Sequence, residues 1–322
     1  MPEPEARPGL TLPRWLKYSL GVFVVALAFY FLLSRLLRDW SQIPFSELHF
    51  SPWLLALSFA VLIGTHLPLA GSAWGLILKG LGEPLDLGRA IAVMSVTQLG
   101  KYVPGKLWFT LGRMSLLKSD SIPEAKTMVS VVVEIVLSLL AALVLLGCAV
   151  ILTPRALVPD ALYLAFLLVP VCVIVVYPRV LNRVLAYALR RLKQPIFELR
   201  LTYRQLLAIT GLYLADWTLQ GVGSFILLNS FYPLPITRLP VVLGGYAISW
   251  MVGFLALVAP AGLGIREGIF TLILKIVMPG PVAIIFTLLT RVWMTVSEAV
   301  VALVCLPLLN RRRRNETETQ TR

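Results

Sequence analysis

The sequence predicts an all-α integral membrane protein with about eight transmembrane helices and one re-entrant helical hairpin. The chain is 58% hydrophobic and only 14% charged over its 322 residues. Its mean hydropathy is +0.84, which lies outside the usual range of soluble domains. Lys and Arg gather between the apolar runs, as in membrane proteins. This placement accounts for the net charge of +13 without a nucleic acid partner.

Most of the apolar runs are long enough to cross a hydrocarbon core, which needs about 20 helical residues. The first run, from about Leu16 to Leu37, is interpreted as an uncleaved anchor, because Arg35 and Arg38 follow it in place of a cleavage site. The later spans are expected at about Trp53–Leu78, Met128–Leu152, Leu162–Val176, Leu206–Leu228, Val241–Val258, Ile265–Met278 and Val282–Leu308.

The segment from about Ala90 to Leu117 differs from these spans, because a polar break divides it into two apolar halves. Each half has about ten residues, which is too short to cross the core. We therefore expect a re-entrant hairpin whose two ends lie on the same side of the membrane.

The charges of the loops predict the orientation. Basic residues crowd the loop from Pro178 to Arg204 and the segment Arg311–Arg314, which should both be cytoplasmic, as should the N-terminus. With both termini inside, the number of crossings is even, and this parity makes Ile265–Met278 a crossing despite its Lys275. We expect a multi-pass plasma-membrane protein, with one polytopic domain over residues 1–310 and a basic, disordered cytoplasmic tail over residues 311–322.

The first polar break combines helix breakers with fixed positive charge. Non-helical backbone at membrane depth is tolerated where it is buried in protein or lines a polar cavity, and a helix that starts after a break can receive a phosphate. This predicts a site for a lipid phosphate, although an interfacial anchor resting on anionic lipid is the alternative. The candidate residues are Lys101, Tyr102, Pro104, Gly105, Lys106 and Arg113.

The second break contains Gly262 and Gly264, followed by Arg266 and Glu267 at the start of a helix. Glu267 complements the helix dipole there, but Arg266 does not. A guanidinium beside free backbone N–H groups suits an anion, so we assign these four residues to the same headgroup site. The alternative is a structural Arg–Glu pair that closes the start of the helix.

Four more ionisable residues interrupt the spans: Glu134, Asp216, Arg291 and Glu298. Such residues usually face the interior of the bundle, so each is a candidate for a charge relay or for a contact that joins helices. His66, close to Pro68, is interpreted as a polar contact at a kink. No spacing of His, Cys or carboxylates indicates a metal site or a cofactor.

The two breaks carry a family resemblance. The segment Gln98–Lys106, with Gly112 and Arg113 after it, and the segment Pro260–Gly268 resemble the lysylphosphatidylglycerol synthase transmembrane-region family, also called flippase-like domains. Longer relatives add a soluble aminoacyl-transferase domain. We expect no such domain in this sequence, so the resemblance is not taken to imply synthase activity. It implies movement of a lipid or lipid-linked sugar between leaflets, with the two breaks as the site.

Three functions remain open at this point. The first is a flippase-like transporter of an anionic or phosphate-bearing lipid, either a phospholipid or a polyprenyl-phosphate-linked molecule. The second is a non-transporting scaffold or accessory protein for enzymes of envelope lipid or glycan synthesis, and the third is a polyprenyl-phosphate-dependent transferase. We expect the transporter rather than an enzyme, because no DxD or His/Asp set occurs in a loop. The oligomeric state and the energy source are not predicted.

Overall fold

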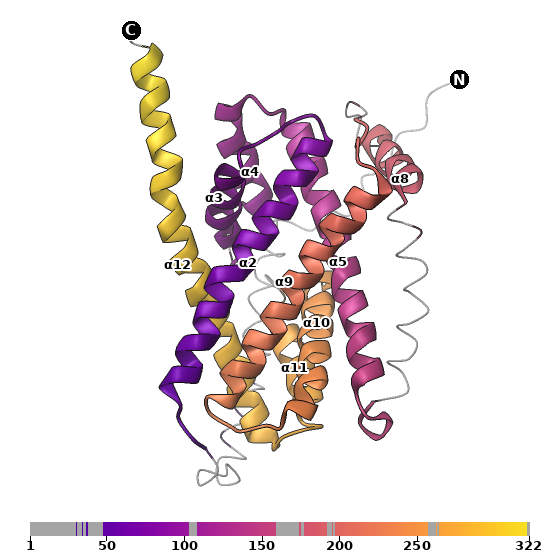
Figure 1. The fold of residues 1–322 in the computed structure, drawn as a ribbon, viewed down its shortest axis with the longest axis vertical. Helices are drawn as coiled ribbons and strands as arrows, with labels where there is room; N and C mark the ends of the chain where they lie inside the picture. Colours follow the sequence, from indigo (N-terminus) through magenta and orange to yellow (C-terminus); the bar gives the residue numbers. More distant parts are fainter. Residues whose placement is uncertain are drawn as a thin grey trace, which may run out of the picture.

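The computed structural model describes residues 48–102, 108–158, 177–191, 195, 197–256, 262 and 264–320, the single positions 30, 34, 37 and 174, and no side chain at 188 or from 310 onward. These residues form helices and no strand (Figure 1). The fold is therefore the all-α membrane protein that the sequence predicts. The first expected span and the span expected at Leu162–Val176 lie almost entirely outside the described residues.

Four long helices build the frame: α2 (Pro52–Gly80), α5 (Glu124–Leu152), α9 (Tyr203–Asn229) and α12 (Gly280–Gln320). The segments Pro52–Gly80, Glu124–Leu152 and Gly280–Leu309 have the length and apolar composition of membrane spans, as does Ile236–Leu255. A fifth helix, α8 (Pro178–Arg191), forms the first part of the basic loop from Pro178 to Arg204.

Local sequence determines where two of the long helices begin. The Ser51 hydroxyl accepts a hydrogen bond from the Leu54 amide at the start of α2. At the start of α9, Thr202 and Gln205 exchange side-chain-to-backbone hydrogen bonds, which satisfies two donors that the first turn leaves free.

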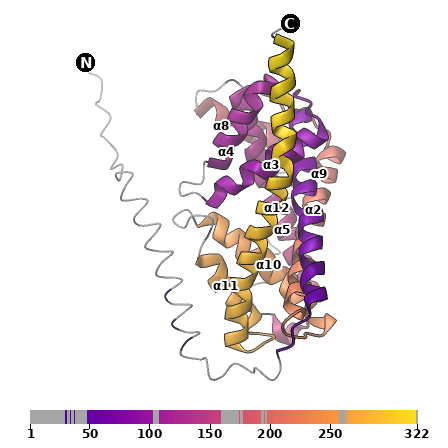
Figure 2. The same cartoon turned by 90° about the vertical axis from the view of Figure 1, so that its left-hand side faces the viewer.

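The short helices form two hairpins that enter the bundle from opposite ends. The first consists of α3 (Leu87–Gln98), a 3₁₀ turn (Leu99–Tyr102) and α4 (Trp108–Leu117). The second consists of α10 (Leu239–Leu255) and α11 (Ile265–Leu274). In both ribbon views α3 and α4 lie toward the end where the chain terminates, whereas α10 and α11 lie in the other half (Figures 1 and 2).

This arrangement bears on one expectation. α11 has ten residues and is therefore about 15 Å long, half of a core of about 30 Å, so the helix at the expected crossing Ile265–Met278 is shorter than a full span. It returns beside α10 to the end from which α10 starts (Figure 2). The even number of crossings is unaffected, since the hairpin of α10 and α11 returns to the end from which it starts.

Glycines allow the hairpins to approach their neighbours closely. A Cβ on Gly71 of α2 would lie 2.7 Å from the Ile91 Cα of α3. A Cβ on Gly100 would lie 2.7 Å from the Phe109 amide nitrogen of α4. Small residues at such contacts are how membrane helices maximise packing.

The bundle is polarised in charge. The end where α12 finishes also holds the last turn of α2, the first turns of α3, α5 and α9, and α8 (Figure 1). The basic residues of these segments are Lys79, Arg89, Lys118, Lys126, Arg179, Arg183, Arg190, Arg191, Arg200, Arg204 and Arg311–Arg314. The loops at the other end contain Arg155, Arg238 and Lys275, so the basic loops share one side of the molecule, as the sequence predicts.

The last helix extends beyond the apolar part of its sequence. α12 continues to Gln320, and the disordered tail expected over residues 311–322 stays a prediction. Arg, Glu and Gln have high helix propensity, so a helix that has already formed can propagate through this polar segment.

Candidate functional site

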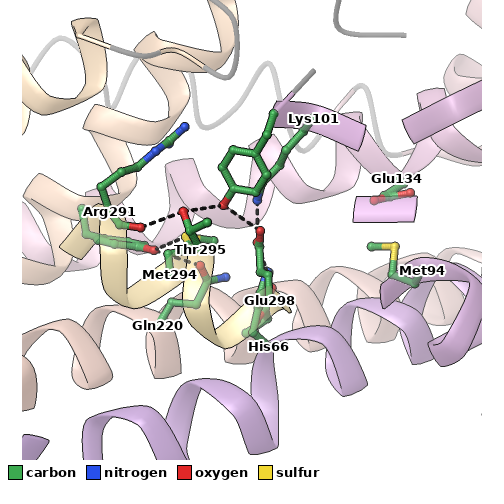
Figure 3. Close-up of polar contacts among 12 residues, drawn as sticks. His66, Met94, Lys101, Glu134, Gln220, Arg291, Met294, Thr295 and Glu298 are labelled. Atoms are coloured by element: carbon green, nitrogen blue, oxygen red, sulfur yellow. Dashed lines mark hydrogen bonds and ion pairs between the residues drawn. The ribbon is translucent and has the colours of Figure 1, made fainter. Parts of the chain in front are cut away.

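The described ends of the two hairpin breaks meet α12 in the interior of the bundle, where polar side chains from five elements form a cluster. Figure 3 shows the part of it around Glu298, with His66, Lys101 and Thr295. We call the whole cluster the central cluster. It consists of His66 (α2), Lys101 and Tyr102 (the 3₁₀ turn), Asp216 (α9), Arg266 and Glu267 (α11), and Arg291, Thr295 and Glu298 (α12).

The tip of the first hairpin is attached to α12 through Glu298. Lys101 donates a hydrogen bond of 2.5 Å to one carboxylate oxygen of Glu298, and the Tyr102 hydroxyl donates one of 2.8 Å to the other. Thr295 in turn donates to the Tyr102 hydroxyl at 3.2 Å. Glu298 is 1% exposed, so this carboxylate has replaced water with protein donors.

His66 lies between two carboxylates. Its Nδ1 is 2.9 and 3.2 Å from the two carboxylate oxygens of Asp216. Its Nε2 is 3.4 Å from Glu298 Oε1, at ion-pair distance but outside hydrogen-bond geometry. The sequence-based interpretation of His66 as a polar contact at a kink missed this position, because its partners are on helices far away in the chain.

The second break needs its glycines. Gly262 and Gly264 have φ values of 67° and 84°, which side chains rarely adopt. A Cβ on Gly262 would also lie 2.7 Å from the Gly253 carbonyl oxygen of α10. The backbones of α10 and of the break therefore lie directly against each other, and this holds the start of α11 at the cluster.

Glu267 and Arg266 have different roles at the start of α11. Glu267 caps the helix, because its carboxylate accepts a 2.6 Å hydrogen bond from the Gly264 amide. Its other oxygen is 3.9 Å from Nη1 of Arg291. The pairing of Arg266 with Glu267, which the sequence left as the alternative to a headgroup site, is absent among the described ion pairs, so Glu267 alone caps the helix.

Arg266 is a buried cation with no ion pair to a carboxylate within 4.0 Å among the described residues. It is 6% exposed, and its guanidinium lies 5.0 Å from the centroid of the Tyr246 ring. Its nitrogens approach the Met294 sulfur at 3.7 and 3.8 Å, which is a weak acceptor. Nearby, Nη2 of Arg291 is buried without a hydrogen-bond partner among the described atoms. The cluster therefore presents unused guanidinium donors on two neighbouring elements.

Arg113 lies elsewhere. Its side chain is completely buried, donates two hydrogen bonds to Glu134 of α5, and has its guanidinium 4.7 Å from the Trp74 ring centroid. Glu134 is separated in Figure 3 from the residues around Glu298. Arg113 and Glu134, both candidate site residues from the sequence, therefore pair with each other and join α4 to α5. Pro104, Gly105 and Lys106 lie outside the described residues.

An apolar pocket lies between α5, α10 and α11, lined by residues that include Leu146, Val150, Ile248 and Ile273. It shares no residue with the central cluster.

A comparison with known protein families covers the segments that form the central cluster. The sequence pattern of the family described as Lysylphosphatidylglycerol synthase TM region matches residues 18–304, which is most of the chain. The chain belongs to this family. It matches no curated protein and no solved structure.

Membership of the Lysylphosphatidylglycerol synthase TM region family establishes a membrane domain of this type. The match spans both hairpins and all nine residues of the central cluster. Other polar members of the site were not singled out from the sequence, namely Gln220 and Tyr246, whose side chains hydrogen-bond to each other at 3.1 Å. A signal was available for Gln220, because it follows Asp216 by four residues and thus lies on the same face of α9.

Proposed function

We propose that this protein moves an anionic or phosphate-bearing lipid between the leaflets of a membrane, and that the headgroup binds in the central cluster. The observation that carries the proposal is Arg266, a buried cation that makes no ion pair with a carboxylate within 4.0 Å among the described residues. A charge at mid-membrane costs at least about 2.5–3.5 kcal/mol. An anion held by Arg266 and the unused Nη2 of Arg291 offsets that cost.

The chemistry of the site favours a phosphate over a carboxylate. Arg266 and Arg291 are both planar donors that bind two oxygens at once, and Lys101 adds a point charge within the same cluster. Three cations on three elements can each bind an oxygen of a phosphate, whereas a carboxylate has only two oxygens to offer them. The first break and the second break contribute one cation each, so the ligand joins the two hairpins.

The architecture supports a transport role. Discontinuous helices near the bilayer midplane are typical of transporters, where they present free backbone groups and charges to a substrate. Here two hairpins reach the cluster from opposite ends (Figure 2). A headgroup bound between their tips has one hairpin on each side, which is the geometry that alternating access requires.

Two alternative functions, a scaffold and a transferase, explain fewer of these observations. A scaffold for envelope-synthesis enzymes has no need for the unpaired charge of Arg266. A transferase needs a carboxylate or imidazole that is available for proton transfer to substrate. In the central cluster Glu298, Asp216 and Glu267 are engaged by Lys101, His66 and the Gly264 amide, respectively. We therefore infer a transporter rather than an enzyme.

We infer that the basic end of the bundle faces the cytoplasm and that the membrane is the plasma membrane, with both termini inside. Cysteine labelling in intact cells tests the orientation. Arg155→Cys, exposed at the opposite end, should react with an impermeant maleimide, whereas Lys118→Cys should react only after permeabilisation. The reverse pattern contradicts the orientation.

Reconstituted vesicles test the function. The purified protein is placed in phosphatidylcholine vesicles that contain tail-labelled phosphatidylglycerol, and loss of outer-leaflet fluorescence on reduction reports translocation. We expect Arg266→Ala to abolish it, and Arg266→Lys to reduce it nearly as much, because lysine lacks the planar fork. Arg155→Ala is the control and should retain the parental rate.

Two further arms identify the ligand. Labelled phosphatidylcholine in place of phosphatidylglycerol tests the need for net negative charge, and a polyprenyl phosphate tests the other lipid class. Inorganic phosphate added to the buffer should compete only weakly, because it lacks the chains that keep a lipid in the bilayer. A well-folded Arg266→Ala protein that moves each anionic lipid at the parental rate contradicts the proposal.

A further inference from the structure

The central cluster contains a second ionisable centre that headgroup binding does not use directly. His66 is 7% exposed and has a carboxylate facing each ring nitrogen. A neutral imidazole has one N–H, so it can donate to only one of the two carboxylates. The doubly protonated ring can donate to Asp216 through Nδ1 and places its second N–H at ion-pair distance from Glu298. This position is therefore built to hold a proton inside the bundle.

The proton on His66 bears on the anion site through Glu298. In the structure Glu298 is balanced by Lys101 at 2.5 Å and faces His66 Nε2 at 3.4 Å. If Lys101 turns to a phosphate, Glu298 loses its nearest cation. A protonated His66 then remains to balance Glu298, whereas a neutral His66 leaves a buried carboxylate uncompensated, which is strongly unfavourable.

We propose that His66 is the proton site of a proton-coupled transporter, in which one proton binds together with one anionic headgroup. When His66 is protonated, Glu298 releases Lys101 to the headgroup. When His66 loses its proton, Glu298 reclaims Lys101 and the headgroup leaves. This inference rests on the proposed function, because Lys101 must have an anion to bind.

The other charged or ionisable groups around His66 do not replace it in this role. Those on the elements packed against α2 are Asp216 and Tyr213 (α9), Glu298 (α12), Lys101 and Tyr102 (the 3₁₀ turn), and Glu134 with its partner Arg113 (α5 and α4). Asp216 contacts only the far nitrogen of His66 in the described structure, and Glu134 is held by Arg113. Arg266 and Glu267 face the cluster from α11.

Coupling of this kind has a defined direction. Because the proton and the headgroup favour each other, each must raise the affinity for the other by the same factor. The headgroup then binds more tightly at low pH. Between the pH at which His66 loses its proton in the free protein and the higher pH at which it does so in the complex, affinity falls by up to about tenfold per pH unit for one linked proton. A monoanionic phosphodiester that enters with one proton adds no net charge to the cluster.

The test measures binding of dioctanoyl phosphatidylglycerol to the full-length protein in a phosphorus-free detergent between pH 6 and 9. This probe is a phosphodiester, which does not itself titrate in that range. Calorimetry in two buffers of different ionisation enthalpy gives the number of protons taken up. The parental protein should bind more weakly as pH rises and take up as much as one proton per headgroup.

Two substitutions should remove the pH dependence in opposite ways. His66→Gln cannot carry the proton, so it should bind weakly at each pH. Glu298→Gln no longer competes for Lys101, so it should bind at pH 9 as tightly as the parental protein binds at pH 6. A merely structural role for either residue would not give two flat profiles at opposite levels. His49→Gln, an exposed histidine outside the cluster, is the control and should match the parental profile.

The outcomes separate this inference from the proposed function. If the parental protein binds the probe with no pH dependence and no proton uptake, and Arg266→Ala abolishes binding, the anion site stands and the proton site is wrong. An affinity that follows sodium concentration rather than pH also contradicts it. If Arg266→Ala binds the probe as the parental protein does, or the parental protein binds none at any pH, the proposed function fails and the proton site fails with it.

Discussion

Arg113 in the first hairpin and Arg266 in the second are similar in sequence and different in structure. Each lies in the second helix of its hairpin, after a break, and both are buried, with exposures of 0% and 6%. Arg113 has Glu134 as a partner, whereas Arg266 has a ring and a sulfur. The comparison teaches that a buried arginine suggests a ligand site only where no carboxylate of the protein forms an ion pair with it.

The largest expected effect comes from removing the partner of Arg113. Glu134→Gln leaves a completely buried guanidinium uncompensated and should destabilise the protein by about 3–5 kcal/mol. Unfolding in detergent, followed by loss of the monodisperse peak on heating, measures it. Arg113→Met combined with Glu134→Leu replaces the pair by apolar side chains and should restore most of the loss. A Glu134→Gln protein as stable as the parent would make Arg113 a second free cation and remove the contrast.

The glycines of the second break should give the next largest effect. Gly262→Ala puts a Cβ at a φ of 67° and 2.7 Å from the Gly253 carbonyl oxygen, so it should cost about 1–3 kcal/mol. Gly268→Ala is the matched control in the same segment. A Cβ there meets no atom within 4 Å, and alanine favours the interior of a helix over glycine by about 0.5–1 kcal/mol, so thermal stability should rise. Equal effects of the two substitutions would mean that the break is not held by backbone contact.

The smallest expected effect on stability is that of Arg266→Ala. Removing a charge that no described carboxylate balances should change the free energy of unfolding by less than about 1 kcal/mol, or stabilise the protein. Arg89→Ala, which removes the 2.9 Å ion pair with Asp120 near the basic end, should be clearly destabilising in the same thermal assay. If Arg266→Ala destabilises as much as Arg89→Ala does, Arg266 is structural.

The hairpin around Lys101 and the helix break before Arg266 could be predicted from the sequence, because helix breakers and charge inside apolar sequence have few explanations in a bilayer. The structure brings both segments to the central cluster, and the headgroup site there stays a proposal. The sequence did not predict that α10 and α11 form a second hairpin. The apolar run before the second break was long enough for a span. The parity argument requires only an even number of crossings, and this number is even whether both helices cross the membrane or neither does. Length and charge therefore left these two topologies unresolved.

The partners of the buried charges were beyond prediction from the sequence alone. Asp216 meets His66 across 150 residues of chain, and Glu298 meets Lys101 across 197. The local sequence does not predict that Glu134 pairs with Arg113, whereas Glu298 pairs with Lys101 in the central cluster. That difference arises only when α5 and α12 pack against different faces of the first hairpin.

The central claim is that a lipid phosphate lies against the Arg266 guanidinium between the two hairpins. Dipolar-coupling NMR between nitrogen-15 in arginine side chains and phosphorus-31 in dioctanoyl phosphatidylglycerol measures this contact directly in a phosphorus-free detergent. We predict a signal at hydrogen-bond range that disappears in Arg266→Lys and persists in Arg155→Ala. A signal that is unchanged in Arg266→Lys, or that is absent from the parental protein with the lipid bound, contradicts the account.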